Sequence, residues 1–438
     1  MAWVDKGVHA RRRERFMAAI DGAIAIFAGA PETVRSNDVH HRYRQESDFL
    51  YLTGFAEPGA YLVLDAGANR HRYTLYVPPK DPAMERWTGR RAGVAGARRR
   101  FGADAAHEAG TFFDHLARLL AGRDRVYLRL GYDAKVDQAV IDQIATMRGR
   151  SRAGAHGPAQ VVDPTPILAE QRLLKSEAEL DLLQRAVDIT AQGHLAAMRA
   201  LRPGMAEYEV EAEIEYHFRR AGAAGPAYPT ICGSGVNATI LHYVENDRRM
   251  RRGDLLLIDA GAEYGGYAGD VTRTIPVGGR FGEAQRAVYE VVLNANRVAI
   301  RRVRPGVTFD AVHHAAVREL TRGLVRLGLL TGDPKKLIQD GAYRRFYMHR
   351  TSHWLGLDVH DVGRYYLDDH KPRPLEPGMV LTIEPGLYID AAPDIPKPFH
   401  GIGIRIEDDV LVTDGPARVL SAAIPKDVDA IERAMAGA

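Results

Sequence analysis

The chain has 438 residues, 46% of them hydrophobic, and this length allows two domains with sizeable cores. Its 59 lysine and arginine residues nearly balance 56 aspartate and glutamate residues, and no basic stripe predicts nucleic acid as a partner. No segment reaches the roughly 20 uninterrupted apolar residues of a membrane span, and the single cysteine, Cys232, cannot form an intrachain disulfide. The composition therefore argues against a membrane protein and a disulfide scaffold, and favours a cytoplasmic enzyme.

The first 165 residues carry a pattern typical of an α/β domain. The string RRRER at 11–15 precedes an apolar run that Asp21 interrupts, which favours an amphipathic first helix and a strand over a targeting segment. Further predicted elements are strands at Ala60–Asp65 and Arg72–Val77, a solvated loop at Gly89–Arg100 and a helix near Thr111–Ala121. The segment Asp163–Pro166, with its two prolines, is interpreted as the linker, so the predicted domains are residues 1–165 and 166–438.

The second domain begins with a long predicted helix and contains an internal repeat. Ser176 and Glu179 form a capping-box pattern that opens a helix through about Arg199. The string LRPG at 201–204 recurs as VRPG at 303–306, and GDLLLIDAG at 253–261 recurs loosely as GMVLTIEPG at 378–386, which aligns Asp259 with Glu384. A duplicated helix-and-hairpin unit would then supply one carboxylate from each half. A chance match of short glycine-containing strings is the alternative.

Two aspartates lie in the first hairpin of this repeat. The apolar runs at 255–264 and 267–276 are separated by two glycines, the signal of a tight β-hairpin turn. If that turn sets the register, Asp270 lies opposite Gly261 and on the same side of the sheet as Asp259, with the backbones about 7 to 8 Å apart. Both carboxylates could then reach metal ions about 3.5 to 4 Å apart, whereas a slip of one residue would separate them. Two solvated aspartates at strand ends are the alternative, although both lie in apolar runs.

Two glutamates lie on a second pair of predicted strands. Glu384 ends one apolar run, and Glu407 lies in another, on the same face as Arg405. An arginine beside a ligating glutamate orients it and offsets its charge. Four converging carboxylates would raise one another's pKa, a conflict that a divalent metal resolves. With His353 as the only imidazole, the oxygen-rich set favours an ion such as Mn²⁺ over a structural zinc.

Residues 170–425 resemble the catalytic domain of the pita-bread metallopeptidases, and among them the aminopeptidase P family. The strings that carry the resemblance are GSGVNATILHYVEND, IDAGAEYGGYAGDVTRT, SHWLGLDVHDVG, LTIEPGLY and GIGIRIEDD. The string RYRQESDFLYLTGFAEPGAYLVL is similar to the amino-terminal domain of the same peptidases, so the resemblance covers nearly the whole chain. It implies an amino-terminal α/β domain followed by a pita-bread catalytic domain, of α+β type, with an internal pseudo-twofold repeat.

The resemblance also carries functional residues over to matching positions. The family's dinuclear metal ligands correspond to Asp259, Asp270, His353, Glu384 and Glu407. His242 and His360 match substrate-contacting histidines, and Arg405 matches an arginine close to the site. His349 resembles a histidine that supports the ligands, with a packed histidine satisfied by the backbone as the alternative.

The implied activity is that of a metal-dependent exopeptidase with two divalent ions, expected to be Mn²⁺. It would release the first residue from peptides with proline second, by metal-hydroxide attack on the Xaa-Pro bond. Glu384 would be both ligand and proton shuttle, while His242 and His360 would donate hydrogen bonds to the oxyanion and to the carbonyl on the proline side. Tyr388 and Trp87 are predicted to line the proline subsite, with Trp87 reaching it from a neighbouring subunit of a homo-oligomer, a dimer or a tetramer.

Two other functions stay open at this stage. A prolidase, which cleaves only Xaa-Pro dipeptides, would share all five ligands, although the strings RQESDFLYLTGF and SHWLGLDVHD favour aminopeptidase P. A non-peptidase member of the fold would be expected to lose ligands, and all five are present. His313 and His314, in a helical pattern, are most simply surface residues.

Overall fold

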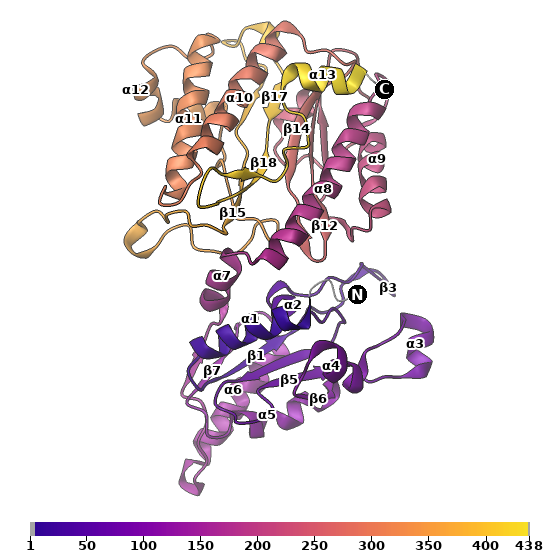
Figure 1. Cartoon of the computed structure of the whole chain (residues 1–438), viewed down its shortest axis with the longest axis vertical. Coiled ribbons are helices and arrows are strands. Elements are labelled where there is room, and N and C mark those ends of the chain that lie inside the picture. Colours follow the sequence, from indigo (N-terminus) through magenta and orange to yellow (C-terminus); the bar gives the residue numbers. More distant parts are fainter. Residues whose placement is uncertain (1–4, 437–438) are drawn as a thin grey trace. The chain divides into compact units, whose positions relative to one another are not determined.

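The computed structural model describes residues 5–436, apart from the side chain of residue 369. The chain divides into two compact units, Met1–Gln171 and Arg172–Ala438. Both mix helices with strands, as the predicted fold class requires (Figure 1). Within residues 5–436, none of the helices combines the length and the apolar character needed to cross a membrane.

The first unit is a six-stranded mixed sheet with helices on both faces. Its helices are α1 (Lys6–Ala19), α2 (Ser47–Thr53), α3 (Pro82–Thr88), α4 (Gly93–Phe101), α5 (Phe112–Leu120), α6 (Ala134–Gly149) and most of α7 (Thr165–Leu173). Its strands are β1 (Ile24–Ala28), β4 (Tyr61–Asp65), β5 (Tyr73–Val77), β6 (Ala105–Glu108), β7 (Arg125–Tyr127) and β8 (Gln160–Val162), in the order β6-β5-β4-β1-β7-β8, and β2 (Val34–Ser36) pairs with β3 (Val39–His40) outside it. The predicted first helix and strand, the two later strands and the helix near residue 111 are all confirmed.

Strand β1 shows how the two faces are covered. Alternate residues of a strand point to opposite faces, so Ile24 and Ile26 pack with α5 and α6 in one core cluster. Phe27 points to the other face, where its ring meets Phe16 of α1 edge to face, with ring centroids 5.6 Å apart. Every residue of β1 is buried. A central strand buried on both faces explains why its sequence is a continuous apolar run.

Two predictions in this unit are wrong. The predicted loop at Gly89–Arg100 largely forms helix α4, because arginine and alanine are strong helix formers and Gly102, with φ of 71°, ends the helix in the left-handed conformation. The segment 163–166, interpreted as the linker, instead contains the start of a helix, since α7 begins at Thr165 and Asp163 accepts a hydrogen bond from the Thr165 amide at 2.9 Å. The division between the two compact units falls within α7, after residue 171.

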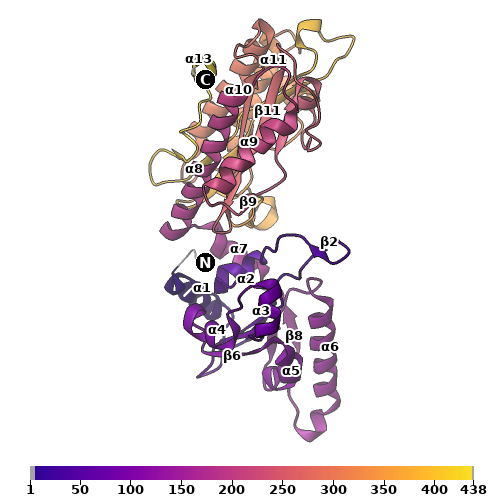
Figure 2. The ribbon, with the colours of Figure 1, turned by 90° about the vertical axis from the view of Figure 1, so that its right-hand side faces the viewer.

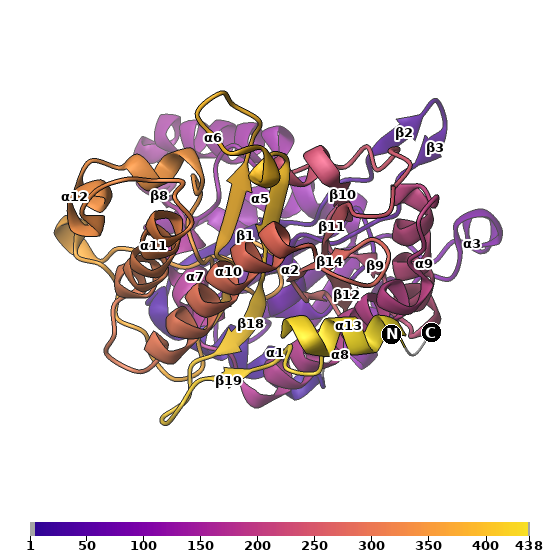
Figure 3. The ribbon, with the colours of Figure 1, turned by 90° about the horizontal axis from the view of Figure 1, so that it is seen from above.

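The second unit consists of two helix pairs packed against short antiparallel sheets (Figures 2 and 3). Its helices are α8 (Glu177–Ala200), α9 (Glu207–Arg220), α10 (Glu283–Arg302), α11 (Phe309–Arg326), α12 (Pro334–Gln339) and α13 (Val428–Ala436). Its strands are β9 (Gly225–Pro226), β10 (Ile231–Ser234), β11 (Leu255–Ala260), β12 (Ala262–Tyr264), β13 (Tyr267–Ala268), β14 (Val271–Pro276), β15 (Val380–Ile383), β16 (Gly386–Ile389), β17 (Ile402–Arg405), β18 (Asp408–Leu411) and β19 (Arg418–Val419). The capping box at Ser176 and the long helix after it are confirmed.

The first hairpin has the predicted register. Gly265 and Gly266 form its turn with φ of 63° and 87°, a conformation that glycine adopts without strain. Asp259 pairs with Thr272, and Glu263 pairs with Ala268, so one register runs along the hairpin and places Asp270 opposite Gly261. The hairpin bends at Gly261, where β11 gives way to β12, and only glycine fits there because any side chain would collide with the Gly269 carbonyl.

The second hairpin repeats this arrangement. Ile383 pairs with Asp408 before the bend and Gly386 pairs with Arg405 after it, so the shared register brings Glu384 opposite Glu407. Strand β14 of the first hairpin lies beside the second, because the Glu407 amide donates to the Thr272 carbonyl at 3.0 Å. Helix pair α8 and α9 precedes the first hairpin, and pair α10 and α11 precedes the second. The predicted internal repeat is therefore a feature of the fold.

Candidate metal centre

A cavity of about 1070 Å³ lies where the two hairpins meet. All five predicted ligands line it: Asp259, Asp270, His353, Glu384 and Glu407. His242, His349, His360 and Arg405 line it as well. The structure thus brings together residues that are up to 165 positions apart in the sequence.

Asp259 and Asp270 are joined by a tyrosine that the sequence did not reveal. The Tyr228 hydroxyl lies 2.6 Å from Asp259 Oδ1 and 2.6 Å from Asp270 Oδ1. Burial and the two neighbouring carboxylates raise the pKa of Tyr228 well above its usual value, so the hydroxyl keeps its proton. One proton can serve only one carboxylate at a time, so Tyr228 fixes the spacing of the pair without neutralising it.

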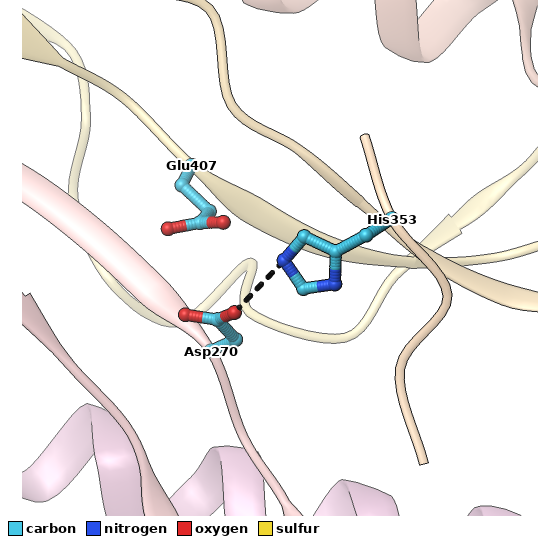
Figure 4. Close-up of side chains that lie close together, drawn as sticks. All are labelled: Asp270, His353 and Glu407. Carbon is cyan, nitrogen blue, oxygen red and sulfur yellow. Dashed lines mark ion pairs between the residues drawn. The ribbon is translucent and has the colours of Figure 1, made fainter. Parts of the chain in front are cut away.

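His353 links this pair to the second hairpin (Figure 4). Its Nε2 lies 3.2 Å from Asp270 Oδ2, and one ligand atom each of Asp270, His353 and Glu407 lie within 4.8 Å of one another. Its Nδ1 lies 3.0 Å from the Trp354 carbonyl, which accepts a hydrogen bond from Nδ1–H and leaves Nε2 facing the carboxylates. Burial alone would lower the pKa of His353, but the hydrogen bond to Asp270 and the charge of Glu384 raise it to about 9. A bound cation would take the place of that proton.

The second hairpin supplies two glutamates and a buried arginine. Glu384 Oε1 lies 3.7 Å from His353 Nε2, and Glu407 Oε2 accepts a hydrogen bond from the Thr272 hydroxyl at 2.7 Å. Arg405 donates through one guanidinium nitrogen to Asp259 Oδ2 at 2.5 Å, and its Nε donates to the Thr272 hydroxyl oxygen at 3.0 Å. Arg405 thereby offsets one of the four carboxylate charges and orients Asp259.

The electrostatics of the cluster fit a divalent cation. Burial raises the pKa of Glu384 to about 7, and burial with the charges of Asp270 and Glu384 raises the pKa of Glu407 well above its usual value. Burial also raises the pKa of Asp259, against the opposing charge of Arg405. Such raised values mean that the protein alone does not compensate these carboxylates, which a cation would do. Oxygen donors with one imidazole are a suitable ligand set for that role.

Behind Asp270 lies a further buried carboxylate, Asp409. Its Oδ2 accepts a hydrogen bond from the Asp270 amide at 3.0 Å, and its Oδ1 has no hydrogen-bond partner among the described residues. Burial and the charge of Asp270 raise the pKa of Asp409 well above its usual value. Asp409 therefore holds the backbone amide of a predicted ligand.

The other predicted histidines lie around the cluster. The His360 ring is 4.4 Å from the His353 ring, centroid to centroid, and burial and that neighbour lower the pKa of His360, which favours the neutral imidazole. His349 Nδ1 lies 2.7 Å from the Arg350 carbonyl and 3.6 Å from Glu384 Oε2, and its role beside the predicted ligands stays a prediction. Burial and Arg405 lower its pKa to about 3. His242 also lines the cavity, but it forms no ion pair with a described carboxylate.

Two other residues differ in how they relate to the cavity. Tyr388 is buried behind the lining, where its hydroxyl accepts a hydrogen bond from Arg405 at 3.0 Å and lies 2.9 Å from His349 Nε2, and its place in a proline subsite stays a prediction. Trp87 belongs to α3 of the first unit, where 85% of its surface is exposed, and its place in a proline subsite stays a prediction.

His313 is not a surface residue, because it is buried in α11 with Nδ1 2.8 Å from the Thr351 hydroxyl. The helical pattern alone did not show which face of α11 packs inward.

The bent hairpins, the duplicated helix pairs and the buried carboxylates define a class, the pita-bread metal-dependent hydrolases. Residues 181–414 match the model of metallopeptidase family M24, and residues 9–127 match that of the aminopeptidase P N-terminal domain. The chain therefore belongs to metallopeptidase family M24, with an amino-terminal domain of the aminopeptidase P type. The predicted family and fold class are confirmed.

Individual relatives extend over the full length of the chain. The chain is 46% identical to the Xaa-Pro aminopeptidase of Escherichia coli (strain K12), covering 100% of this chain and 99% of that protein. The structure of Pseudomonas aeruginosa aminopeptidase PepP matches with a TM-score of 0.97 and 47% identity, covering 100% of this chain and 99% of that one. A glutamate-to-alanine variant of Escherichia coli aminopeptidase P in complex with substrate matches with a TM-score of 0.96 and 45% identity, covering 99% of each chain.

Proposed function

We propose that this chain is a metal-dependent aminopeptidase that releases the amino-terminal residue from peptides with proline in second position. The observation that carries the proposal is the buried cluster of four carboxylates and His353, in a chain that matches a relative named Xaa-Pro aminopeptidase along its full length. A peptidase of this kind needs a cavity that is negatively charged where the free α-amine binds, and the cluster supplies that charge.

Two divalent ions, with Mn²⁺ as the proposed metal, would be held by the five ligands named above. When bound, such ions acidify a water molecule and polarise the scissile carbonyl. Five protein ligands are more than the three of a single catalytic zinc site, which supports two ions rather than one. Four of the five are hard oxygen donors, which supports Mn²⁺ over zinc. Tyr228 and Arg405 fix Asp259 from two sides, so the spacing of the carboxylates is set before any ion arrives.

The protein's own groups would move the proton and bind the developing charge. Glu384 lines the cavity and would accept the proton of the attacking water at a carboxylate oxygen, then pass it to the proline nitrogen that leaves. His242 would donate a hydrogen bond to the oxyanion. His360, neutral because of its lowered pKa, would donate to the carbonyl on the proline side.

Proline in second position explains why such a site must bind several groups at the amino-terminal end of the substrate. An Xaa-Pro amide has no N–H, so the donor that most peptidases use to hold the scissile bond is missing. Binding must come instead from the α-amine, the proline ring and the next carbonyl. The cavity offers carboxylates for the amine and apolar side chains such as Leu241, Val244 and Phe309 for the ring.

The proposal includes the cellular compartment, the cytoplasm, and the assembly state, a homo-oligomer. The single cysteine, Cys232, is buried and unpaired, which suits a reducing cytoplasm. Trp87 and Met84 expose 85% and 42% of their surfaces on α3, and apolar side chains of that kind suit a contact between copies in a dimer or tetramer. Sedimentation at several concentrations checks the assembly state.

Metal reconstitution and a peptide pair test the function. Removal of metal with a chelator should abolish cleavage, and Mn²⁺ should restore it with two ions per chain by elemental analysis. Under the same loading, an Xaa-Pro-Xaa tripeptide should be cleaved well and the Xaa-Pro dipeptide poorly. Preference for the dipeptide would identify a prolidase, and full activity in a metal-free preparation would refute metal dependence. A tripeptide with alanine second should be cleaved slowly, because the ring contacts are lost.

A further inference from the structure

Three arginines line the cavity, and they differ in whether the protein supplies a counter-charge. Arg405 pairs with Asp259, and Arg350 pairs with Asp310. Within residues 5–436, no described carboxylate forms an ion pair with Arg364, whose side chain is exposed. The cavity therefore presents one cation whose partner the described protein does not provide.

The chain that follows Arg364 is firmly held. The Tyr365 ring stacks on Trp354 with centroids 5.4 Å apart and lies 4.8 Å from the Phe309 ring, and its hydroxyl oxygen accepts a hydrogen bond from the Trp354 amide at 3.2 Å. The Tyr366 hydroxyl donates to Asp310 at 3.1 Å. A cation on a fixed backbone loses less conformational freedom on binding than one on a mobile loop.

The position of Arg364 suits the far end of a short substrate. It follows His360 by four residues, so the two Cα atoms are at most about 14 Å apart, while a fully extended tripeptide spans about 10 Å. The α-amine of a substrate would lie at the carboxylate cluster in the same cavity. A negative charge one or two residues after the proline would then fall within the range of the Arg364 side chain.

We infer that Arg364 is a specificity-determining residue that binds a carboxylate on the leaving-group side of the peptide. The inference rests on the proposed function and adds a charge preference to it. Two sources supply the same chemistry, the α-carboxylate of a tripeptide and an aspartate or glutamate side chain just after the proline. With carboxylates for the amine and Arg364 for the carboxylate, the cavity would distinguish the two ends of a short peptide by charge.

Four substrates separate these sources. The first pair is the tripeptide Ala-Pro-Ala as free acid and as carboxy-terminal amide, and the second is Ala-Pro-Glu-Ala amide and Ala-Pro-Gln-Ala amide. The Mn²⁺-loaded enzyme should prefer the charged member by about two- to five-fold in kcat/KM, the size of an exposed ion pair. The difference should lie in KM, because the contact is remote from the bond that breaks, and it should shrink in high salt.

Substitutions at Arg364 then test its part in this preference. Arg364→Gln should remove the preference, Arg364→Lys should keep part of it, and Arg364→Glu should reverse it. Arg344→Gln is the matched control, since it removes an exposed positive charge of the same unit outside the cavity lining and should leave the preference intact.

Each outcome has one meaning. A preference in the first pair alone assigns the α-carboxylate as the source, and one in the second pair alone assigns the side chain. Equal cleavage within both pairs, or a preference that survives Arg364→Gln, would overturn the inference. Failure of the proposed function looks different, because none of the four peptides would then be cleaved.

Discussion

In the first half of the catalytic unit Asp259 lies opposite Thr272, whereas in the second half Glu384, at the corresponding position, lies opposite Glu407. The two halves also differ at the cross-strand pair two residues nearer the turn of each hairpin. Asp270 lies opposite Gly261 in the first half, and Arg405 lies opposite Gly386 in the second. The halves share one fold and one register, but each has a carboxylate where the other has a hydroxyl or a guanidinium.

These differences make the halves complementary. Thr272 of the first half donates to Glu407 of the second at 2.7 Å, and Arg405 of the second donates to Asp259 of the first at 2.5 Å. If both halves kept carboxylates at every one of these positions, the buried charge would be larger still, with no guanidinium to offset it. The duplication therefore provides the frame, and the divergence of two positions provides the support for the ligands.

The largest expected effect comes from removing a charge at the corresponding ligand positions. Glu384→Gln should lower kcat/KM by at least about 10³-fold, because the change removes a ligand charge and the proposed proton shuttle while keeping the shape of the side chain. Asp259→Asn should reduce bound metal without removing the shuttle. Kinetics and elemental analysis on both variants compare the two halves, and near-normal turnover in Glu384→Gln would contradict the proposed role.

The next effect separates a histidine that binds substrate from one that binds metal. His242→Ala should lower kcat by about 10²- to 10³-fold, the loss expected from one oxyanion donor, and should keep the metal bound. His353→Ala should instead lose metal, because its Nε2 faces the carboxylates. If His242→Ala emptied the site, the distinction between ligand and donor would be wrong.

A third prediction tests the link between the halves away from the cavity. Arg273 of β14 is fully buried, pairs with Asp408 of β18 at 2.8 Å and donates to the Glu407 carbonyl at 2.5 Å. Arg273→Met should lower the free energy of unfolding by about 3 to 5 kcal/mol, since it leaves Asp408 charged and buried, with Lys426 as its one remaining ion-pair partner among the described residues. Denaturant titration measures this. The exposed pair Arg286 and Asp429 is the control, and Arg286→Met should cost less than about 1 kcal/mol.

The sequence predicted the two hairpins better than it predicted the residues that hold the carboxylates in place. Two glycines at a turn fix the register, and the register fixes which carboxylates share a face. The placement of Asp259 and Asp270 on one face therefore followed from local rules. Thr272 could have been found in the same way, as the residue opposite Asp259. Tyr228 could not, because the glycine and proline residues around it predict a turn but set no register with the hairpin, and only tertiary packing brings its hydroxyl to the aspartates. The same limit explains His313, whose burial depends on which face of α11 packs inward.

The smallest expected effect tests the complementarity of the halves most directly. Thr272→Val keeps the shape of a fully buried side chain but removes the hydroxyl that donates to Glu407 and accepts from Arg405. Loss of a hydrogen bond that orients a metal ligand weakens metal binding by about 10- to 100-fold. Titration of the metal-free protein with Mn²⁺, followed by calorimetry, measures this affinity.

Thr274 offers the matched control on the same strand and the same face. Among the described residues, its hydroxyl forms hydrogen bonds with the backbone of Arg405, at 3.1 and 3.2 Å, and with no predicted ligand, so Thr274→Val removes a buried hydroxyl without touching a ligand. Both substitutions should destabilise the fold by a similar amount, because each leaves a buried hydrogen-bonding group without its partner. Only Thr272→Val should weaken metal binding. Equal metal affinities in the two variants would contradict the proposed role of the Thr272 hydroxyl in holding Glu407.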